Sequence, residues 1–504
     1  MICDVMAIFS IRTRERYAHF RKCARAGRFF TLLPAAVLLA LLAACAVGPD
    51  YVKPGVTVPE KYKETDGWKV AQPGDDAARG PWWEIFGDDD LNALENQVDI
   101  SNQNVRVAEA QFRQARALVE AARSSFFPAV VAGASFTRSQ RSANVSRNTG
   151  TSSGLSSDYL LPVNVSWELD LWGRIRRTVE ALRAGAEAGA ADLEAMRLSS
   201  QAELALAYFQ LRISDVQKKL LDETTEAFKK SLELTRNQYE CGIVSKADML
   251  QAEAQLKTTQ AQALDVGVQR TQLEHAIALL AGKPASTFSI PVKTGIMSPP
   301  DIPVGIPSEL LERRPDIAAA ERRVKAANAR IGVAVAAFFP TVSLGATGGY
   351  ESSSSSDWLT WPSRIWAVGP SVTETVFDGG YRSALSDEAR AAYDAAVASY
   401  RQVVLTGFQE VEDNVAALRI LEQESRAQDE AVNAARKFLE ISLNQYKEGL
   451  VNYLNVTVAQ AAALNSERTL INILGRRMSA SVLLVKALGG GWQSKNIGSA
   501  MLSR

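Results

Sequence analysis

The chain has 504 residues, 47% hydrophobic and 22% charged, a composition that supports a folded core and excludes a disordered chain. Lysine plus arginine and aspartate plus glutamate both number 56, so the formal net charge is zero. This balance gives no global attraction to nucleic acid, and we expect no nucleic-acid partner.

The first 44 residues have the pattern of a signal peptide. Seven basic residues precede an apolar run from Phe29 to Ala44, which is too short to span a membrane comfortably. The run ends in Leu42-Ala43-Ala44-Cys45, which is similar to the lipobox where bacterial lipoproteins are cleaved and acylated. We expect Cys45 to become the mature N-terminus and to carry diacylglycerol and fatty acyl groups. A plain signal peptide cut nearby, or a buried apolar helix with a chance cysteine, are the alternatives.

Cysteine and histidine are scarce in the mature chain. Once the signal is removed and Cys45 is acylated, Cys241 has no cysteine partner, which excludes an intrachain disulfide or a cysteine metal site. His275 is the single remaining histidine. We therefore expect no metal and no catalytic residues.

A tandem duplication is the strongest internal feature. Residues 109–128 read EAQFRQARALVEAARSSFFP, and residues 321–340 read ERRVKAANARIGVAVAAFFP, in register through both Phe-Phe-Pro ends. Further on, Asn-Gln-Tyr ending at Tyr239 recurs ending at Tyr446, and each copy is followed by a glycine, Gly242 or Gly449. The halves match in order, which predicts two copies of one structural unit.

Each copy begins with a helical stretch over 105–124 or 317–336. The helix ends at Phe-Phe-Pro because proline cannot continue a helix. A change to a period of two then predicts strands, most clearly from Val163 to Leu171, where apolar residues alternate with Asn164, Ser166, Glu168 and Asp170. The predicted strands are about 129–138 and 159–172 in the first copy, and about 341–350 and 365–377 in the second. Polar stretches between them, flanked by aromatic residues, are typical of exposed loops.

Very long helices follow, since prolines are absent from Val163 to Lys283 and from Ser371 to Arg504. A helix from about Ile175 to Tyr239 is about 100 Å long at 1.5 Å per residue. Gly242 and Gly449 are suited to left-handed turns after such helices, and Ser245 with Asp248 predicts a capping box that restarts the helix. Each copy should therefore contain a helical hairpin.

These elements define the expected organisation of the chain. We predict a signal peptide at 1–44, a lipidated N-terminal and equatorial segment at 45–95, a first repeat at 96–282 with its hairpin tip near 242, a proline-rich equatorial linker at 283–316, a second repeat at 317–490 with its tip near 449, and a C-terminal tail at 491–504.

The amphipathic strands predict a wall between lipid and water, although a soluble sandwich strand shows the same alternation. Four strands cannot close a barrel, because about eight is the practical minimum and open edges in lipid leave backbone groups unsatisfied. Several copies must therefore share one barrel, with eight strands from two copies or twelve from three.

Several stretches resemble the outer-membrane efflux proteins, in particular the lipoproteins that serve resistance-nodulation-division pumps. They are Cys45 to Tyr51, Trp82-Trp83 with Phe86 and Asp88, and Leu311 to Pro340. The resemblance implies a mainly α fold: a trimer with a shared twelve-stranded outer-membrane barrel, a periplasmic tunnel of long helical hairpins and an equatorial belt. It also implies passive conduction of small molecules from an inner-membrane pump and a periplasmic adaptor.

By the same resemblance, Tyr239, Gly242, Tyr446 and Gly449 mark the hairpin tips that contact the adaptor. The pore constriction of the family corresponds to Leu454, Val458 and Ala461. Val458 and Ala461 depart from the family's charged pattern, which favours an apolar constriction that excludes water over a charged latch.

Two other classes of protein were weighed. A lipid-anchored periplasmic adaptor also has long helical hairpins, but it lacks paired amphipathic strands and this kind of duplication. A secreted enzyme lacks support because the sequence contains no nucleophile elbow, metal-spaced cluster or phosphate loop. Glu168 and Asp170 are interpreted as solvated groups on the polar face of a strand rather than as a catalytic pair.

Overall fold

The computed structural model describes residues 46–63, 81–140, 142, 155–295, 298–300, 302 and 313–490. The predicted signal peptide, Cys45 and the tail at 491–504 lie outside the described residues. So do most of the first polar loop and most of the linker after residue 295.

Both copies of the repeat contain the predicted short helix before a strand. Helix α3 spans Gln103–Arg123 and α7 spans Pro315–Ala336. Phe-Phe-Pro follows in each case, and strand β1 (Ala129–Ala132) or β4 (Thr341–Ser352) begins directly after the proline. The proline thus separates helix from strand as the sequence indicates.

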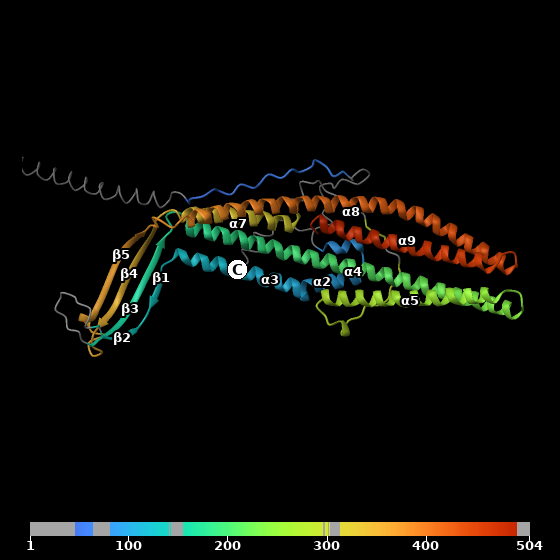
Figure 1. Cartoon of the computed structure of the whole chain (residues 1–504), viewed down its shortest axis with the longest axis horizontal. Helices are drawn as coiled ribbons and strands as arrows, with labels where there is room; N and C mark the ends of the chain where they lie inside the picture. The colour runs from blue at the N-terminus through green and yellow to red at the C-terminus, as the bar shows by residue number, and fades with distance from the viewer. Residues whose placement is uncertain are drawn as a thin grey trace, which may run out of the picture. The chain divides into compact units, whose positions relative to one another are not determined.

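The described strands form one antiparallel sheet (Figure 1). Its remaining members are β2 (Ser135–Gln140), β3 (Leu155–Leu169) and β5 (Arg364–Thr373). The order is β1-β3-β4-β5, and β2 continues along β3 beyond β1. The described sheet therefore has two open edges, one formed by β1 with β2 and the other by β5.

The predicted strands differ from the observed ones at several points, and β3 begins at Leu155 rather than at about residue 159. The strand expected over 129–138 is split into β1 and β2, because Pro162 of β3 lacks an N–H: Gly133 N donates to Pro162 O at 3.0 Å, and no bond returns. The strand expected to reach 172 ends at Leu169. The strand expected to reach 377 ends at Thr373, because Asp378 accepts bonds from the backbone N–H groups of Gly380 and Arg382 and turns the chain into a helix.

One face of the sheet is apolar. The pairing places Trp167 opposite Leu344, and Leu344 opposite Pro370. The same face carries Val163, Val165 and Leu169 of β3, Val342, Ala346 and Gly348 of β4, and Trp366, Val368 and Val372 of β5. Trp366 remains 80% exposed in the single chain. Such a surface is unfavourable in water, so we expect it to contact lipid or another apolar surface.

The opposite face is polar and made of small residues. Thr347 Oγ1 donates to Asn164 Oδ1 at 2.8 Å across β3 and β4. The face also carries Ser166 and Glu168 of β3, Ser343 and Gly345 of β4, and Ala367, Gly369 and Ser371 of β5. Small polar side chains leave room for water, as expected for the lining of an aqueous passage.

Two pairs of long helices complete the repeats. Helices α4 (Arg174–Glu240) and α8 (Tyr381–Lys447) have 67 residues each, and α5 (Lys246–Leu280) and α9 (Tyr453–Ala487) have 35 each. The equal lengths support the duplication. No helix among the described residues is both long enough and apolar enough to cross a membrane.

Residue contacts divide the chain into two compact units, and each contains parts of both repeats. The described part of the first unit comprises the sheet, residues 46–51 and the helix ends within 118–183 and 326–393. The second unit comprises the rest of the helices and the equatorial segments.

In the second unit, the Trp82-Trp83 pair packs against α4. Both tryptophans are buried, and Trp82 Nε1 donates to Gln201 Oε1 at 3.2 Å. Asp88 caps helix α2 (Asp89–Ser101) and also accepts from Tyr208 Oη at 2.6 Å. The segment before the first repeat is thus fixed to the middle of α4.

Glu95 of α2 makes the stability of the second unit depend on pH. Its side chain is fully buried and neither carboxylate oxygen has a hydrogen-bond partner among the described residues. Burial, reinforced by nearby Asp99, raises the pKa of Glu95 well above its ordinary value. The folded state therefore holds this proton more tightly than the unfolded chain, so stability falls as pH rises above the unfolded pKa.

We expect Glu95→Gln to remove much of this fall in stability with rising pH. The variant should match the parent at about pH 4 and unfold at a higher temperature at about pH 8, as thermal unfolding in detergent measures. Asp265→Asn, at an exposed site on α5, is the control. Parallel pH profiles for Glu95→Gln and the parent would contradict the assignment.

Candidate functional site

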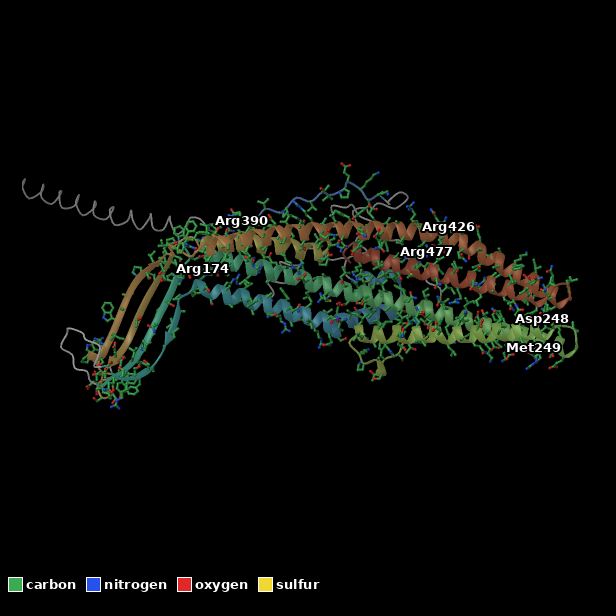
Figure 2. The ribbon with its side chains drawn as sticks, in the orientation of Figure 1. Arg174, Asp248, Met249, Arg390, Arg426 and Arg477 are labelled. Carbon is green, nitrogen blue, oxygen red and sulfur yellow. The ribbon has the colours of Figure 1, made fainter. Side chains whose placement is uncertain are left out.

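Glu168 of β3 and Asp170, just after it, connect the sheet to α4. Arg174 donates to Glu168 Oε2 at 2.6 Å, and Figure 2 labels this arginine at the start of the helix. Asp170 accepts from the backbone N–H groups of Ile175 and Arg176 at 2.9 and 2.8 Å. Asp170 is therefore an N-terminal cap, and both carboxylates are paired with arginine or backbone rather than held as an acid–base pair.

The two turns between long helices have the predicted geometry. Gly242 and Gly449 both have φ of 75°, in the left-handed region that favours glycine. After Gly242, Ser245 and Asp248 form a capping box that begins α5, and Figure 2 labels Asp248 there. After Gly449, Asn452 caps α9. Each turn reverses the chain within five residues, between Glu240 and Lys246 or between Lys447 and Tyr453.

The two tip tyrosines have different environments. Tyr239 is 38% exposed, whereas Tyr446 is only 4% exposed. Tyr446 Oη donates to Gln238 Oε1 at 2.6 Å, and its ring packs against Tyr453 with ring centroids 5.4 Å apart. In this structure Tyr446 joins the second hairpin to α4, and Tyr239 is the more accessible of the two tyrosines. Contact of these tips with an adaptor stays a prediction.

The residues predicted to form a constriction lie on one side of α9. Leu454, Val458 and Ala461 follow at intervals of four and three residues, which places them on the same helical face. Leu454 and Val458 are exposed in the single chain, and Ala461 is partly buried. The neighbouring Tyr453, Val456 and Ala459 are buried. The predicted set is therefore available to line a passage formed with other copies.

A family model described as outer membrane efflux protein matches residues 94–283 and 306–490. The match includes the whole sheet and all four long helices. The chain belongs to this family.

Known efflux channels match nearly the whole chain. It is 32% identical to the probable efflux pump outer membrane protein TtgC of Pseudomonas putida, over 92% of this chain and 96% of that protein. Among solved structures it is similar to the outer-membrane channel OprN, with a TM-score of 0.81, 33% identity and coverage of 89% of this chain and 100% of that one. The open state of the Neisseria gonorrhoeae MtrE outer membrane channel gives 0.77, 28%, 89% and 99%.

These findings establish the role and location of the protein. It is an outer-membrane channel subunit of a tripartite efflux system, located in the outer membrane and extending into the periplasm. The match to channels sets aside the alternative of a periplasmic adaptor. The sequence features that carried the resemblance, together with the duplication, were sufficient for this assignment.

The sequence did not reveal how the efflux subunit connects its two hairpins. Gln238 and Thr235 of α4 lie within 2.6 and 3.4 Å of Tyr446 Oη. Gln217 Nε2 donates to Asn472 Oδ1 at 2.6 Å, and Gln460 Nε2 donates to Ser231 Oγ at 3.1 Å. These polar residues on otherwise apolar helix faces were the one available signal, since buried polar side chains need partners.

We expect Tyr446→Phe to loosen the second turn. Losing the bond to Gln238 should weaken the local structure by about 1 kcal/mol, and amide hydrogen exchange at Gly449 and Leu450 should be about fivefold faster. Tyr239→Phe, which removes the exposed counterpart, should leave exchange at these amides unchanged. Equal effects of the two variants would show that Tyr446 does not fasten the hairpin.

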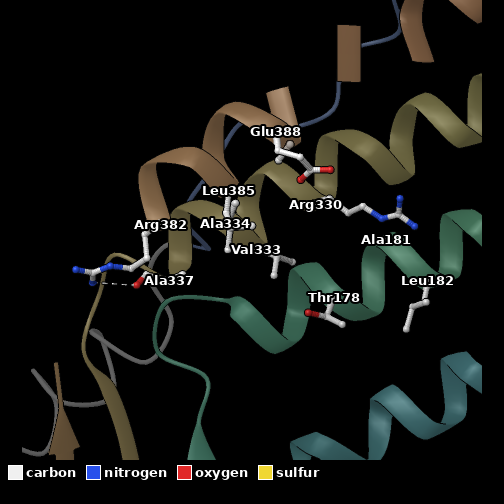
Figure 3. Close-up of a pocket in the computed structure, with 11 residues that line it drawn as sticks. Thr178, Ala181, Leu182, Arg330, Val333, Ala334, Ala337, Arg382, Leu385 and Glu388 are labelled. Carbon is white, nitrogen blue, oxygen red and sulfur yellow. Dashed lines mark hydrogen bonds between the residues drawn. The ribbon is translucent and has the colours of Figure 1, made fainter. Parts of the chain in front are cut away.

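A cavity of about 370 Å³ lies in the first unit between α4, α7 and α8 (Figure 3). Aliphatic residues such as Leu182, Val333 and Leu385 form much of its lining. Arg382 donates to Ala337 O at 3.3 Å, which is the dashed contact in the figure. The lining contains one carboxylate, Glu388, and no histidine or cysteine, so it offers no acid–base pair.

Proposed function

We propose that three copies of this efflux subunit close a single twelve-stranded barrel, through which small molecules pass without energy input from the subunit. The observation that carries the proposal is the open sheet with one apolar face. It presents four strand positions and two unpaired edges, and backbone groups at such edges must be paired in lipid. Three copies supply twelve strands, and the family resemblance in the sequence favours three over two.

The apolar face then contacts lipid and the polar face lines the lumen. Trp366 and Val368 on the edge strand are among the most exposed large residues of the single chain, which fits burial against lipid. The small residues of the polar face, such as Gly345 and Ser371, fit an open aqueous passage.

The hairpin turns are the proposed contact with a periplasmic adaptor, which connects the channel to an inner-membrane resistance-nodulation-division pump. The exposed Gly242 and Gly449 turns, Tyr239, and the exposed apolar residues Ile243 and Leu450 beside the glycines support this contact. Tyr446 is buried and stabilises the second turn through its bond to Gln238. The names of relatives as efflux pump components support a pump partner.

Lipid attachment at Cys45 is the second part of the proposal. The lipobox-like sequence before Cys45 supports it. Labelling cells with palmitate tests it: the parent and Cys241→Ala should incorporate label, and Cys45→Ala should not. Cys241 is an exposed free cysteine and so provides a matched control. Label in Cys45→Ala would exclude this attachment site.

An oligomer of the predicted symmetry should be visible directly. Electron microscopy of the purified mature protein in detergent should show a hollow, threefold particle longer than about 100 Å, as helices of this length require. Twofold particles would exclude the trimer, and compact particles without a lumen would overturn the channel architecture.

We expect Val458→Asp to alter ion selectivity. Three carboxylates at an apolar constriction should raise the cation-to-anion permeability ratio by at least about twofold, as reversal potentials in planar bilayers measure. Val268→Asp on α5, also at an exposed valine, is the control. Unchanged conductance and selectivity in Val458→Asp would remove this residue from the constriction.

A further inference from the structure

Two sequence segments without an assigned role meet in the first unit. Residues 46–51 follow the predicted lipid attachment site, and Asn328 and Gly332 belong to α7, nearly 300 residues later. Asn328 Nδ2 donates to Pro49 O at 2.9 Å, and Val47 N donates to Trp172 O at 3.0 Å, just beyond β3. The segment is thus bonded to both repeats of the chain.

Arg177 of α4 is the charged centre of this contact. It is only 5% exposed, and its guanidinium donates to Asp50 Oδ1 at 2.8 Å and to Glu180 Oε2 at 2.8 Å. It also lies 3.4 and 3.5 Å from the carbonyl oxygens of Val47 and Gly48. Most acceptors of this buried cation therefore come from the N-terminal segment, and without the segment Glu180 alone would remain among them. A buried charge that loses its partners is strongly unfavourable.

At two positions the N-terminal segment and the rest of the protein lie so close that neither leaves room for a Cβ atom. Gly48 has φ of +97°, and a Cβ on it would lie 2.4 Å from Gly332 Cα. On the other side, a Cβ on Gly173 would lie 2.8 Å from Ala46 Cα. Because backbone cannot move aside as a flexible side chain can, these positions accept only glycine in this arrangement. The site is shaped for a segment that bends at a glycine in its third position.

We propose that Gly173, Arg177, Asn328 and Gly332 form a docking site for a peptide that bends at a glycine, and that its occupant is the chain's own segment Ala46–Asp50, which acts as a clasp. The clasp joins the connection from β3 into α4 to the helix α7 that leads into β4. Since β3 and β4 are paired at the middle of the sheet, the clasp holds the two repeats together where β3 ends and β4 begins.

The clasp has a consequence for the lipid anchor, and this part rests on the proposed acylation of Cys45. Ala46 directly follows Cys45, so a docked Ala46 leaves the lipid one residue of tether from Gly173, at the start of α4. The lipid anchor and the clasp are separate attachments, however: the acyl groups bind the membrane, and residues 46–50 bind the rest of the same chain. A variant can lose the second while keeping the first.

Hydrogen exchange on the purified full chain tests the clasp. In Gly48→Ala, the Val47 amide should exchange at least about tenfold faster than in the parent, because its bond to Trp172 O is lost. Gly55→Ala, a few residues beyond the clasp, and Gly87→Ala, also at positive φ, have nothing within 4 Å of the added Cβ and should leave the exchange unchanged. Asn328→Ala is a milder variant, and it should accelerate exchange at Val47 while leaving the helices protected.

Two further readouts keep the outcomes distinct. Palmitate incorporation should be the same in Gly48→Ala and the parent, whereas the fraction that resists dissociation in detergent as an oligomer should fall in Gly48→Ala. Slow Val47 exchange in both Gly48→Ala and Asn328→Ala, or fast exchange in the parent, would overturn the clasp. Absence of palmitate from the parent would instead refute the lipid anchor, and the exchange data would still report on the clasp.

Discussion

Gly349→Ala should prevent assembly of the outer-membrane channel. A Cβ at this position would lie 2.1 Å from Leu161 O and 3.0 Å from Pro162 Cα, both backbone atoms of the paired strand β3. Neither can move without separating β3 from β4 at the centre of the sheet. Overpacking typically destabilises by 1–3 kcal/mol, and a clash with backbone in a central strand pair should reach about 3 kcal/mol or more. The assembled fraction in outer-membrane extracts, measured by unheated gel electrophoresis, should fall sharply.

The adjacent glycine provides the matched control. Gly348 lies in the same strand and has nothing within 4 Å of an added Cβ, so Gly348→Ala should assemble like the parent. The two variants have the same composition and differ by one position in register. Equal assembly of both would show that β3 and β4 do not approach each other as closely as Leu161 and Gly349 do here.

The helices of this fold were accessible from the sequence because local signals specify them. The prolines that end Phe-Phe-Pro stop α3 and α7, and proline-free stretches permit helices of 67 residues. Gly242 and Gly449 mark the turns because left-handed backbone is accessible to glycine at little cost. These features depend on neighbours in the chain, so no tertiary information was needed.

The strands were harder because hydrophobic alternation marks only β3 clearly. On β4 the apolar face includes Ala346 and Gly348, and the polar face includes Gly345 and Gly349, so hydrophobicity hardly distinguishes the faces. The split between β1 and β2 depends on Pro162 in another strand. Pairing partners decide these boundaries, and a single strand does not encode them.

The candidate site shows the same distinction. Asn-Gln-Tyr occurs before both turns, yet Tyr446 is buried against Gln238 while Tyr239 is exposed. Identical local sequence cannot specify this difference, because it arises from where the two hairpins contact each other. Leu454, Val458 and Ala461 share a helical face by spacing alone, which sequence does provide, and their role in a constriction remains a prediction.

A buried ionic network holds the start of the linker between the repeats, and no local sequence motif indicated it. Asp215 of α4 is almost wholly buried and accepts from Arg270 Nε at 2.7 Å and from Lys293 N at 3.2 Å. Arg212 lies 3.4 Å away and donates to Pro291 O at 2.7 Å, while Arg270 donates to Ile290 O at 2.7 Å. Asp215 is the carboxylate that both guanidinium groups share, while Arg212 also pairs with Asp90 at 3.1 Å and Arg270 with Glu274 at 3.5 Å. Together these groups hold the start of the linker.

We expect Asp215→Ala to lower the stability of the second unit by about 3 kcal/mol, since Arg212 and Arg270 lose their shared buried acceptor and keep only the more exposed Asp90 and Glu274. Thermal unfolding in detergent measures the loss, and hydrogen exchange should show Lys293 losing protection with the rest of the linker start. Glu422→Ala, which breaks an exposed pair with Arg426 on α8, should change stability by at most about 1 kcal/mol. Asp215→Asn removes the charge and keeps one acceptor oxygen. If the charge is what Asp215 provides, the loss of stability in Asp215→Asn should approach that in Asp215→Ala. A stability equal to that of the parent would refute the role of charge.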